Sequence, residues 1–437
     1  MQETSSPAPR SVPRGEGWTG APSPSPDLSA PEPKERRDVE QHAELSARMC
    51  PPGWSPGRTA AFLKGLVASE PGVLAGCLAL VQWDESEMGW LRQQGLAAYT
   101  YYRIRAEKLL AQVPEAAQAA LRLAYYGAVA QHILLSVEMD ALLAEFRKLD
   151  IEPIVLKGMA LSTSLYPSPA TRPTSDLDIL IRLPQVEVVR QALAARGYRD
   201  MGLGQGQHVA FAHHLHVWRE SKGGHHIAVE AHWELVHDPG YASRMVVAEF
   251  FSRARRMDAR GDAPLALDPA DQLIHACAHL LLHHAQEFSL LWLLDLRLLV
   301  ARYGQSWDWP ELVERAARFR LAGALRYWLE LTEAWYGPFL PPQAVKVLAT
   351  ARVALEEQWY IATASAGSAR QWEFVWKRAW DVGDARQTLT FLGETFFPPW
   401  AYMQYRYGAR SRWLAPLYYG WRFIRAGWVA FRRVGSG

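Results

Sequence analysis

The sequence predicts an α+β protein in which a small mixed sheet lies between helical segments. Helical periodicity runs from about residue 58 to 150 and returns from about 268, whereas residues 151–235 carry strand patterns mixed with short helices. We therefore expect five parts: a disordered Pro-rich tail, an N-terminal helical region, the α+β core, a helical domain and a basic aromatic C-terminal helix. Their expected bounds are 1–45, 46–148, 149–260, 261–395 and 396–437.

Composition sets broad limits. The length of 437 residues allows about two to three domains. Lysine and arginine number 47 against 45 acidic residues, so the net charge of +2 gives no strong nucleic-acid signal. The three cysteines lie far apart without a CxxC motif, which excludes a disulfide framework or a cysteine-built zinc site. No run approaches the ~18–20 apolar residues of a membrane span, and the N-terminus does not resemble a secretory signal. We expect a cytoplasmic protein.

The first 45 residues have the composition of a disordered segment. Eight prolines fall within the first 33 positions, and large apolar residues are almost absent. Such a segment buries too little apolar surface to offset the entropy lost on ordering.

The stretch 116–147 predicts one long helix. Its apolar residues recur at alternating steps of four and three, which places them along one face. These residues are Leu121, Tyr125, Ala128, His132, Leu135, Met139, Leu142 and Phe146.

The α+β core begins where this periodicity ends. Apolar runs predict strands over 151–156, 176–181 and 227–235. Helical patterns predict short helices over 159–166 and 184–196, and the segment 167–175 is a loop rich in Pro, Ser and Thr. Strands and helices in alternation over so few residues indicate a compact α/β unit.

Two carboxylates on the second strand carry the strongest functional signal. Asp176 and Asp178 are two residues apart, so their side chains share one face of the strand while Leu177 and Ile179 take the other. Paired carboxylates suit Mg²⁺. Glu230, between apolar neighbours on the third strand, would supply a third ligand for a two-metal site of phosphoryl or nucleotidyl transfer.

The residues around these acids favour phosphate binding. Lys157 and Gly158 end the first strand and open a helix, whose N-terminal N–H groups and dipole attract phosphates. Lys157 adds a point charge and Arg172 could bind bidentately. Ser175, next to the first aspartate, completes the predicted nucleotide-binding set.

Four motifs together resemble the uncharacterised nucleotidyltransferase family of bacteria, a branch of the DNA polymerase β-like superfamily. They are Leu156-Lys-Gly158, the segment from Arg172 to Leu180, Arg196-Gly-Tyr198 and the segment from Val229 to Trp233. The resemblance extends over about 60–425.

This resemblance implies a nucleotidyltransferase core with particular residue roles. Asp176 and Asp178 would hold metal ions, Glu230 would be the third carboxylate, and Gly158 would start the nucleotide-binding turn. The chain departs from the superfamily pattern twice. Gly158 is flanked by lysine and methionine where the superfamily usually has serine or glycine, and Glu230 is one methylene longer than the commoner aspartate.

The expected reaction is transfer of a nucleoside monophosphate from an NTP such as ATP, with Mg²⁺ or Mn²⁺, to an acceptor that the sequence does not identify. One alternative is a non-catalytic member that binds a nucleotide or a partner. The other is a His-metal hydrolase, because His275, His279 and His283 step by four along one helical face, although no HExxH motif occurs.

Three further features lie outside this core motif. His232 shares a face with Glu230 and could orient a carboxylate or a phosphate. Asp295 stands alone in an apolar helix, so we expect it to pair with an arginine or to cap a neighbouring element. Residues 401–437 hold seven arginines, ten aromatics and no other charged residue. We expect their aromatic face to pack on the protein, with contact to a polyanion or a membrane surface as the alternative.

Overall fold

The computed structural model describes most of the chain after residue 48. Contacts divide the chain into two units, Met1–Glu40 and Gln41–Gly437, and all described residues belong to the second. The predicted tail and most of the C-terminal segment lie outside the described residues. The described ranges are 49–200, 213–221, 223–236, 238–257, 263–284, 288–354, 357–358, 360–361 and 411–421.

The N-terminal region is helical, as predicted. Asp84 caps one helix by accepting a hydrogen bond from the backbone N–H of Glu87, and Ser55 caps another in the same way. The helices are α2 (Pro56–Val67), α3 (Val73–Leu78), α4 (Glu85–Gln93), α5 (Ala97–Ala106), the 3₁₀ turn η1 (Leu110–Gln112) and α6 (Glu115–Lys148).

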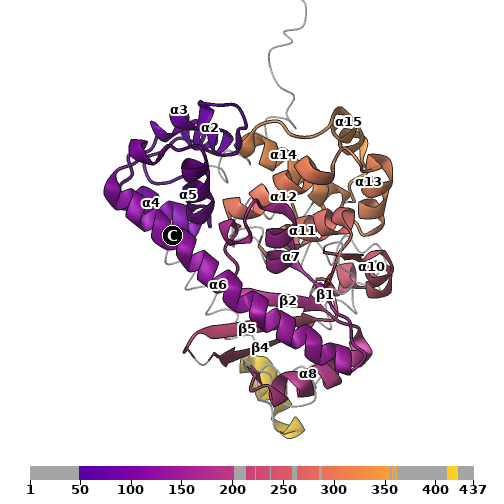
Figure 1. Ribbon diagram of the computed structural model, residues 1–437. Coiled ribbons are helices and arrows are strands. Elements are labelled where there is room, and N and C mark those ends of the chain that lie inside the picture. Colours follow the sequence, from indigo (N-terminus) through magenta and orange to yellow (C-terminus); the bar gives the residue numbers. More distant parts are fainter. Residues whose placement is uncertain are drawn as a thin grey trace, which may run out of the picture. The chain divides into compact units, whose positions relative to one another are not determined.

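Helix α6 confirms the long helix predicted over 116–147, but the predicted stripe is buried only at its two ends. Of the stripe, Leu121, Leu135, Met139, Leu142 and Phe146 are buried, whereas Tyr125 and His132 are half-buried. The reason is that the first part of α6 packs on α5 and its last part packs on the sheet (Figure 1).

The middle of α6 also exposes apolar side chains. By length and composition alone, α6 is long and apolar enough to span a membrane. The sequence predicted no such run. A single helix of this kind does not by itself indicate a membrane span, because core helices of soluble proteins can be equally long and apolar. The exposed residues are Leu123, Tyr126, Ile133 and Val137.

Seven strands of the described residues form one mixed sheet in the order β3-β4-β5-β2-β1-β7-β6. Strand β2 pairs in parallel with β5, and β1 with β7; the other neighbours are antiparallel. This confirms the predicted small mixed sheet. The strands are β1 (Ile154–Val155), β2 (Asp176–Leu180), β3 (Arg199–Asp200), β4 (His214–Glu220), β5 (His226–His232), β6 (Arg255–Arg256) and β7 (Leu265–Ala266).

Several predicted bounds shift. The first strand is only two residues long, and the helix after it, α7 (Lys157–Leu165), begins at Lys157 instead of residue 159. Helix α8 (Val186–Ala195) follows a 3₁₀ turn, η3 (Leu183–Gln185), where one continuous helix was expected. Strand β5 ends at His232, three residues before the predicted end, because its pairing with β4 ends there.

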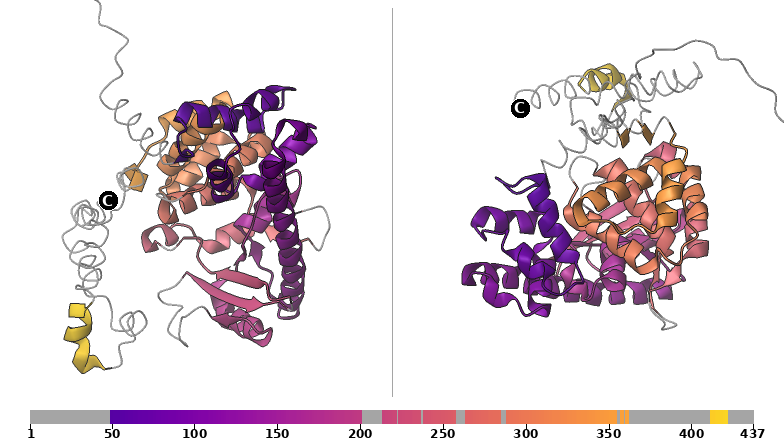
Figure 2. Two further views of the ribbon diagram at one scale, coloured as in Figure 1. Left: turned by 90° about the vertical axis from the view of Figure 1, so that its left-hand side faces the viewer. Right: turned by 90° about the horizontal axis from the view of Figure 1, so that it is seen from above.

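The two faces of the sheet have different partners. Leu177 and Ile179 of β2 and Val229 of β5 are buried in a core cluster that also contains residues of α6 and α8. Figure 2 shows α6 running alongside the sheet. The alternation of β2 therefore directs Asp176 and Asp178 to the opposite face.

Helices return after the sheet, as predicted. Asp268 caps α11 by accepting from the N–H of Ala270 at 3.0 Å, and Pro269 is the first helical residue. A second core cluster joins these helices to α2–α6 and to Leu156 and Leu161 beside the sheet. The helices are α9 (Pro239–Ala242), α10 (Val247–Arg253), α11 (Pro269–His283), α12 (Leu290–Tyr303), α13 (Trp309–Arg318), α14 (Ala322–Tyr336) and α15 (Pro342–Thr350).

Of residues 401–437, only 411–421 fall within the described residues, and they include Leu417 and Trp421 of the expected apolar face. Their side chains are 70% and 57% exposed. The expected packing of the whole stripe on the protein stays a prediction.

Candidate functional site

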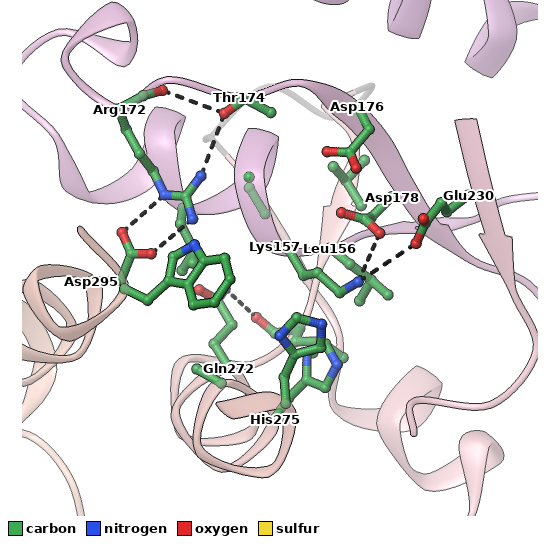
Figure 3. Close-up of a pocket in the computed structure, with 18 of the residues that line it drawn as sticks. Leu156, Lys157, Arg172, Thr174, Asp176, Asp178, Glu230, Gln272, His275 and Asp295 are labelled. Carbon is green, nitrogen blue, oxygen red and sulfur yellow. Dashed lines mark hydrogen bonds and ion pairs between the residues drawn. The ribbon is translucent and has the colours of Figure 1, made fainter. Parts of the chain in front are cut away.

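Three carboxylates meet on the face of the sheet away from α6. The parallel register of β2 and β5 sets Asp178 opposite Glu230, and Asp176 lies two residues earlier on the same face. Asp178 is buried, while Asp176 and Glu230 are half-buried. Figure 3 shows all three side chains in the same pocket. The sequence prediction of a shared acidic site thus agrees with their positions.

Lys157 places a positive charge among these carboxylates. Its Nζ lies 2.9 Å from Oδ1 of Asp178 and 3.8 Å from Oε2 of Glu230 (Figure 3). Lys157 is the first residue of α7 and has a φ of 43°, in the left-handed region that non-glycine residues rarely adopt. Lys157 follows Leu156, the residue directly after β1, whose backbone N–H donates a hydrogen bond to the carbonyl of Asp178 at 2.9 Å.

His232 contacts the same two carboxylate oxygens as Lys157. Its Nε2 lies 3.0 Å from Oδ1 of Asp178 and 3.2 Å from Oε2 of Glu230, and its ring is buried. His232 therefore contacts two carboxylates, and its role in orienting a carboxylate or a phosphate stays a prediction. Its position follows from the strand period, since residue 232 faces the same way as residue 230.

The surroundings set the protonation of the three acids differently. Burial, followed by the charges of Asp178 and Glu230, raises the pKa of Asp176 to about 6. Burial acts on Asp178 too, but Lys157 and His232 outweigh it and hold the pKa of that carboxyl well below its usual value. The pKa of Glu230 is also lowered, because the His232 and Lys157 contacts outweigh burial and the charge of Asp178. Asp178 and Glu230 are therefore ionised at neutral pH.

Glycine is required at position 158 because the loop before β2 approaches its Cα closely. A Cβ on Gly158 would lie 2.5 Å from Cγ2 and 3.1 Å from Oγ1 of Thr174. The loop that precedes β2 therefore packs directly on the first turn of α7. Ser175 in that loop donates a hydrogen bond to Oδ1 of Asp176 at 3.3 Å.

Arg172 is engaged within the protein. Its Nε and Nη2 donate to the two oxygens of Asp295 at 2.9 and 2.8 Å, and the hydroxyl of Tyr166 donates to Oδ1 of Asp295 at 2.7 Å. Both charged groups are buried. The expectation that Asp295 pairs with an arginine is confirmed. Arg172 thus fixes the loop before β2 to α12, and its predicted phosphate contact stays a prediction.

The pocket extends beyond the residues that the sequence singled out. It has a volume of about 360 Å³, within the ~300–1,000 Å³ typical of small-molecule sites. Helices α11 and α12 form its other wall. That wall includes Gln272, His275, His279 and Trp292, which were not predicted to line the carboxylate site.

The side chains present suit a divalent cation. Ligand atoms of Asp178, Glu230 and His232 lie within 4.8 Å of one another, and hard carboxylate oxygens favour Mg²⁺ or Mn²⁺. Two further groups in the described residues are richer in histidine, namely His213-His214-His232 and His214-His216-Glu230. None of the candidate groups found among the described residues uses a histidine of α11.

The mixed sheet, the paired aspartates of β2 and the glutamate of the parallel neighbour β5 together define a nucleotidyltransferase-like protein. The chain belongs to the uncharacterised nucleotidyltransferase family, whose model matches residues 81–337, more than half of its length. The match is shorter than the region of about 60–425 over which the resemblance was expected. No curated protein matches the chain.

Proposed function

We propose that the protein transfers a nucleoside monophosphate from an NTP to an acceptor and releases pyrophosphate. In this reaction a nucleophilic group of the acceptor bonds to the α-phosphorus. The bond from that phosphorus to the oxygen bridging to the β-phosphate breaks, and the acceptor loses a proton. Bound Mg²⁺ or Mn²⁺ would neutralise triphosphate charge and lower the pKa of the acceptor group.

The observation that carries this proposal is the convergence of two carboxylates, Asp178 and Glu230, on one cation, with Asp176 on the same face of the sheet. Asp178 and Glu230 are held in register on adjacent parallel strands, and the ammonium of Lys157 lies between them. A buried cluster of this kind is stable only with a compensating cation.

Each residue then has a role in binding or orientation. Asp176 and Asp178 would hold the ions that bind the triphosphate, and Glu230 would hold the ion nearest the acceptor. Lys157 would move from the carboxylates to the phosphates. The N–H groups of the first turn of α7, at Gly158, would meet a phosphate oxygen.

The first test is binding of each NTP, with and without Mg²⁺ or Mn²⁺, measured as a thermal shift. A ligand at a hundredfold excess over Kd stabilises the folded protein by about 2.7 kcal/mol. We expect a metal-dependent shift in wild type that is lost in D176N/D178N. Asp140→Asn, at an exposed position of α6, is the matched control and should keep the shift.

Transfer itself is tested with NTPs labelled at the α-phosphate and a panel of acceptors. Label should move to an acceptor with wild type and not with Asp178→Asn, and full activity of Asp178→Asn would contradict the proposal. Metal-dependent NTP binding without transfer to any acceptor would favour the non-catalytic alternative. Stoichiometric zinc in the purified protein, without NTP binding, would favour the hydrolase.

A further inference from the structure

The pocket has two chemically different ends. At one end lie Asp176, Asp178, Glu230 and Lys157, all charged. The other end is formed by helices α11 and α12 and carries amide, imidazole and indole groups. Figure 3 shows Glu230 on one side of Asp178, and Asp295 and Gln272 on the other.

The two histidines of α11 that line the second end, His275 and His279, are uncharged at neutral pH. Burial, followed by the charge of Lys157, lowers the pKa of His275 to about 3 and that of His279 well below its usual value. Among the described residues at this end of the pocket, one ion pair is present. It joins Arg172 to Asp295, so the two charges neutralise each other. A phosphate would gain little there, whereas a flat neutral ring system would fit.

The indole of Trp292 supplies an aromatic surface at this end. The ring is half-buried and packs against His284 with centroids 4.6 Å apart and against His279 at 6.2 Å. Trp292 lies one helical turn before Asp295 on α12, so both face the same way. Because Asp295 is bound to Arg172 of the loop before β2, this ion pair fixes the indole relative to the acidic site.

Gln272 supplies an unpaired hydrogen-bond acceptor. Its Nε2 donates to the carbonyl of Leu267 at 2.8 Å, which leaves Oε1 as the remaining polar atom. That oxygen is buried and has no hydrogen-bond partner in the structure. A buried acceptor without a partner is costly. A small rotation of the Gln272 side chain toward the pocket would let a donor group on a bound ligand satisfy it.

We infer that the wall formed by α11 and α12 is the nucleobase subsite, where Trp292 stacks on the base and Gln272 accepts a hydrogen bond from its edge. The inference rests on the proposed function. The base is tethered to the metal-bound phosphates, so it must lie in the same pocket. The acceptor approaches at Glu230, and the base therefore takes the end away from Glu230.

The test compares an NTP with inorganic tripolyphosphate, which has the phosphates but no base. Isothermal titration in Mg²⁺ would give both affinities for wild type, Trp292→Leu, Trp292→Phe and Gln272→Met. Trp413→Leu, which alters a tryptophan that is 94% exposed, is the matched control. Circular dichroism and thermal melts would confirm that each variant is folded.

Base stacking on an aromatic side chain contributes ~1–3 kcal/mol, or roughly 5- to 150-fold in affinity. We expect Trp292→Leu to weaken NTP binding by about tenfold or more and tripolyphosphate binding by less than about twofold. Trp292→Phe should lie between Trp292→Leu and wild type, because it keeps a smaller ring. Gln272→Met should change the ratio of affinities among the four NTPs.

Three results would overturn the inference. Equal losses for NTP and tripolyphosphate in Trp292→Leu would mean a structural effect. No loss for either would mean that the base lies elsewhere. If wild type bound tripolyphosphate as tightly as any NTP, there would be no base subsite, and the proposed function would be unaffected. If neither the NTP nor tripolyphosphate bound in a metal-dependent way, the proposed function would be overturned, and this inference with it.

Discussion

The ammonium of Lys157 lies 2.9 Å from Oδ1 of Asp178, a buried carboxylate that the proposed reaction assigns to a metal ion. In the proposed reaction, lysine and metal would compete for the same oxygen. Lys157 neutralises part of the acidic cluster, and it would have to leave Asp178 for a metal and a triphosphate to bind. The side chain is long and flexible enough to do so.

Replacing Lys157 should change metal and nucleotide affinity in opposite directions. Two unit charges about 4 Å apart interact by about 4 kcal/mol at an effective dielectric of 20. We expect Lys157→Met to bind Mn²⁺ alone at least about fivefold more tightly, because the competing cation is gone, and to bind NTP more weakly. Titration of Mn²⁺ by electron paramagnetic resonance, with and without NTP, measures both. A parallel loss of both affinities would contradict the competition.

Breaking the buried ion pair of Asp295 should cost stability. Asp295→Asn leaves Arg172 buried without its charge partner, and such changes cost about 3–5 kcal/mol. Urea denaturation should show this loss, and a smaller one in the double variant D295N/R172M. Glu330→Gln, which breaks an exposed pair with Arg326, is the control and should cost less than about 1 kcal/mol. Additive losses in the double variant would exclude the coupling.

The stability of the protein should fall in acid partly through His275. This buried ring has its pKa lowered to about 3, and its Nε2 lies 3.2 Å from the carbonyl of Leu235. Its folded pKa is below the unfolded value of about 6.5, so its contribution is present above pH 6.5 and is lost as the pH falls toward 3.

Between pH 7 and pH 5 the loss due to His275 should be about 2 kcal/mol. Urea denaturation of wild type and His275→Gln at both pH values measures the contribution of His275 to the free energy of unfolding, since the variant should lose less stability on acidification. His225→Gln changes an exposed histidine and should behave as wild type. An unchanged pH dependence in His275→Gln would show that this ring is not the responsible group.

A methyl group on Gly158 should disturb the turn where α7 begins. Its Cβ would lie 2.5 Å from Cγ2 of Thr174, closer than such contacts occur, and overpacking typically costs about 1–3 kcal/mol. We expect Gly158→Ala to be destabilised by that amount in thermal melts and to bind NTP more weakly. The double variant G158A/T174A removes the clash and should recover most of the stability. Failure to recover would mean that the backbone of Gly158, and not the contact, is the constraint.

Local patterns in the sequence were sufficient for several elements. The apolar periodicity of α6, the alternation around Asp176 and Asp178, and the Asp-Pro start of α11 each depend on residues within a few positions of one another. Strand β4 carries the same kind of signal, with Leu215 and Val217 buried and His214 and His216 at the alternate positions, but it was not predicted.

Charge arguments predicted types of partner and not their identities. A lone aspartate in an apolar helix had to meet a cation, and the structure gives Asp295 an arginine 123 residues earlier in the chain. Lys157 was assigned to phosphates on sequence grounds, yet it pairs with Asp178. Which of several arginines or carboxylates comes into reach depends on how distant elements pack, and no local pattern encodes that.

The sequence by itself determined the chemistry: which carboxylates share a face, which glycine opens the turn, and to which family the chain is similar. The tertiary structure determined which side chains enclose the pocket. It brought Gln272 of α11 and Trp292 of α12 into the pocket that Asp178 lines, and set Glu230 beside Asp178 through a parallel pairing across 52 residues of chain. The physical reason is that side-chain direction within an element follows from its period, whereas contacts between elements follow from the burial of apolar faces contributed by the whole chain.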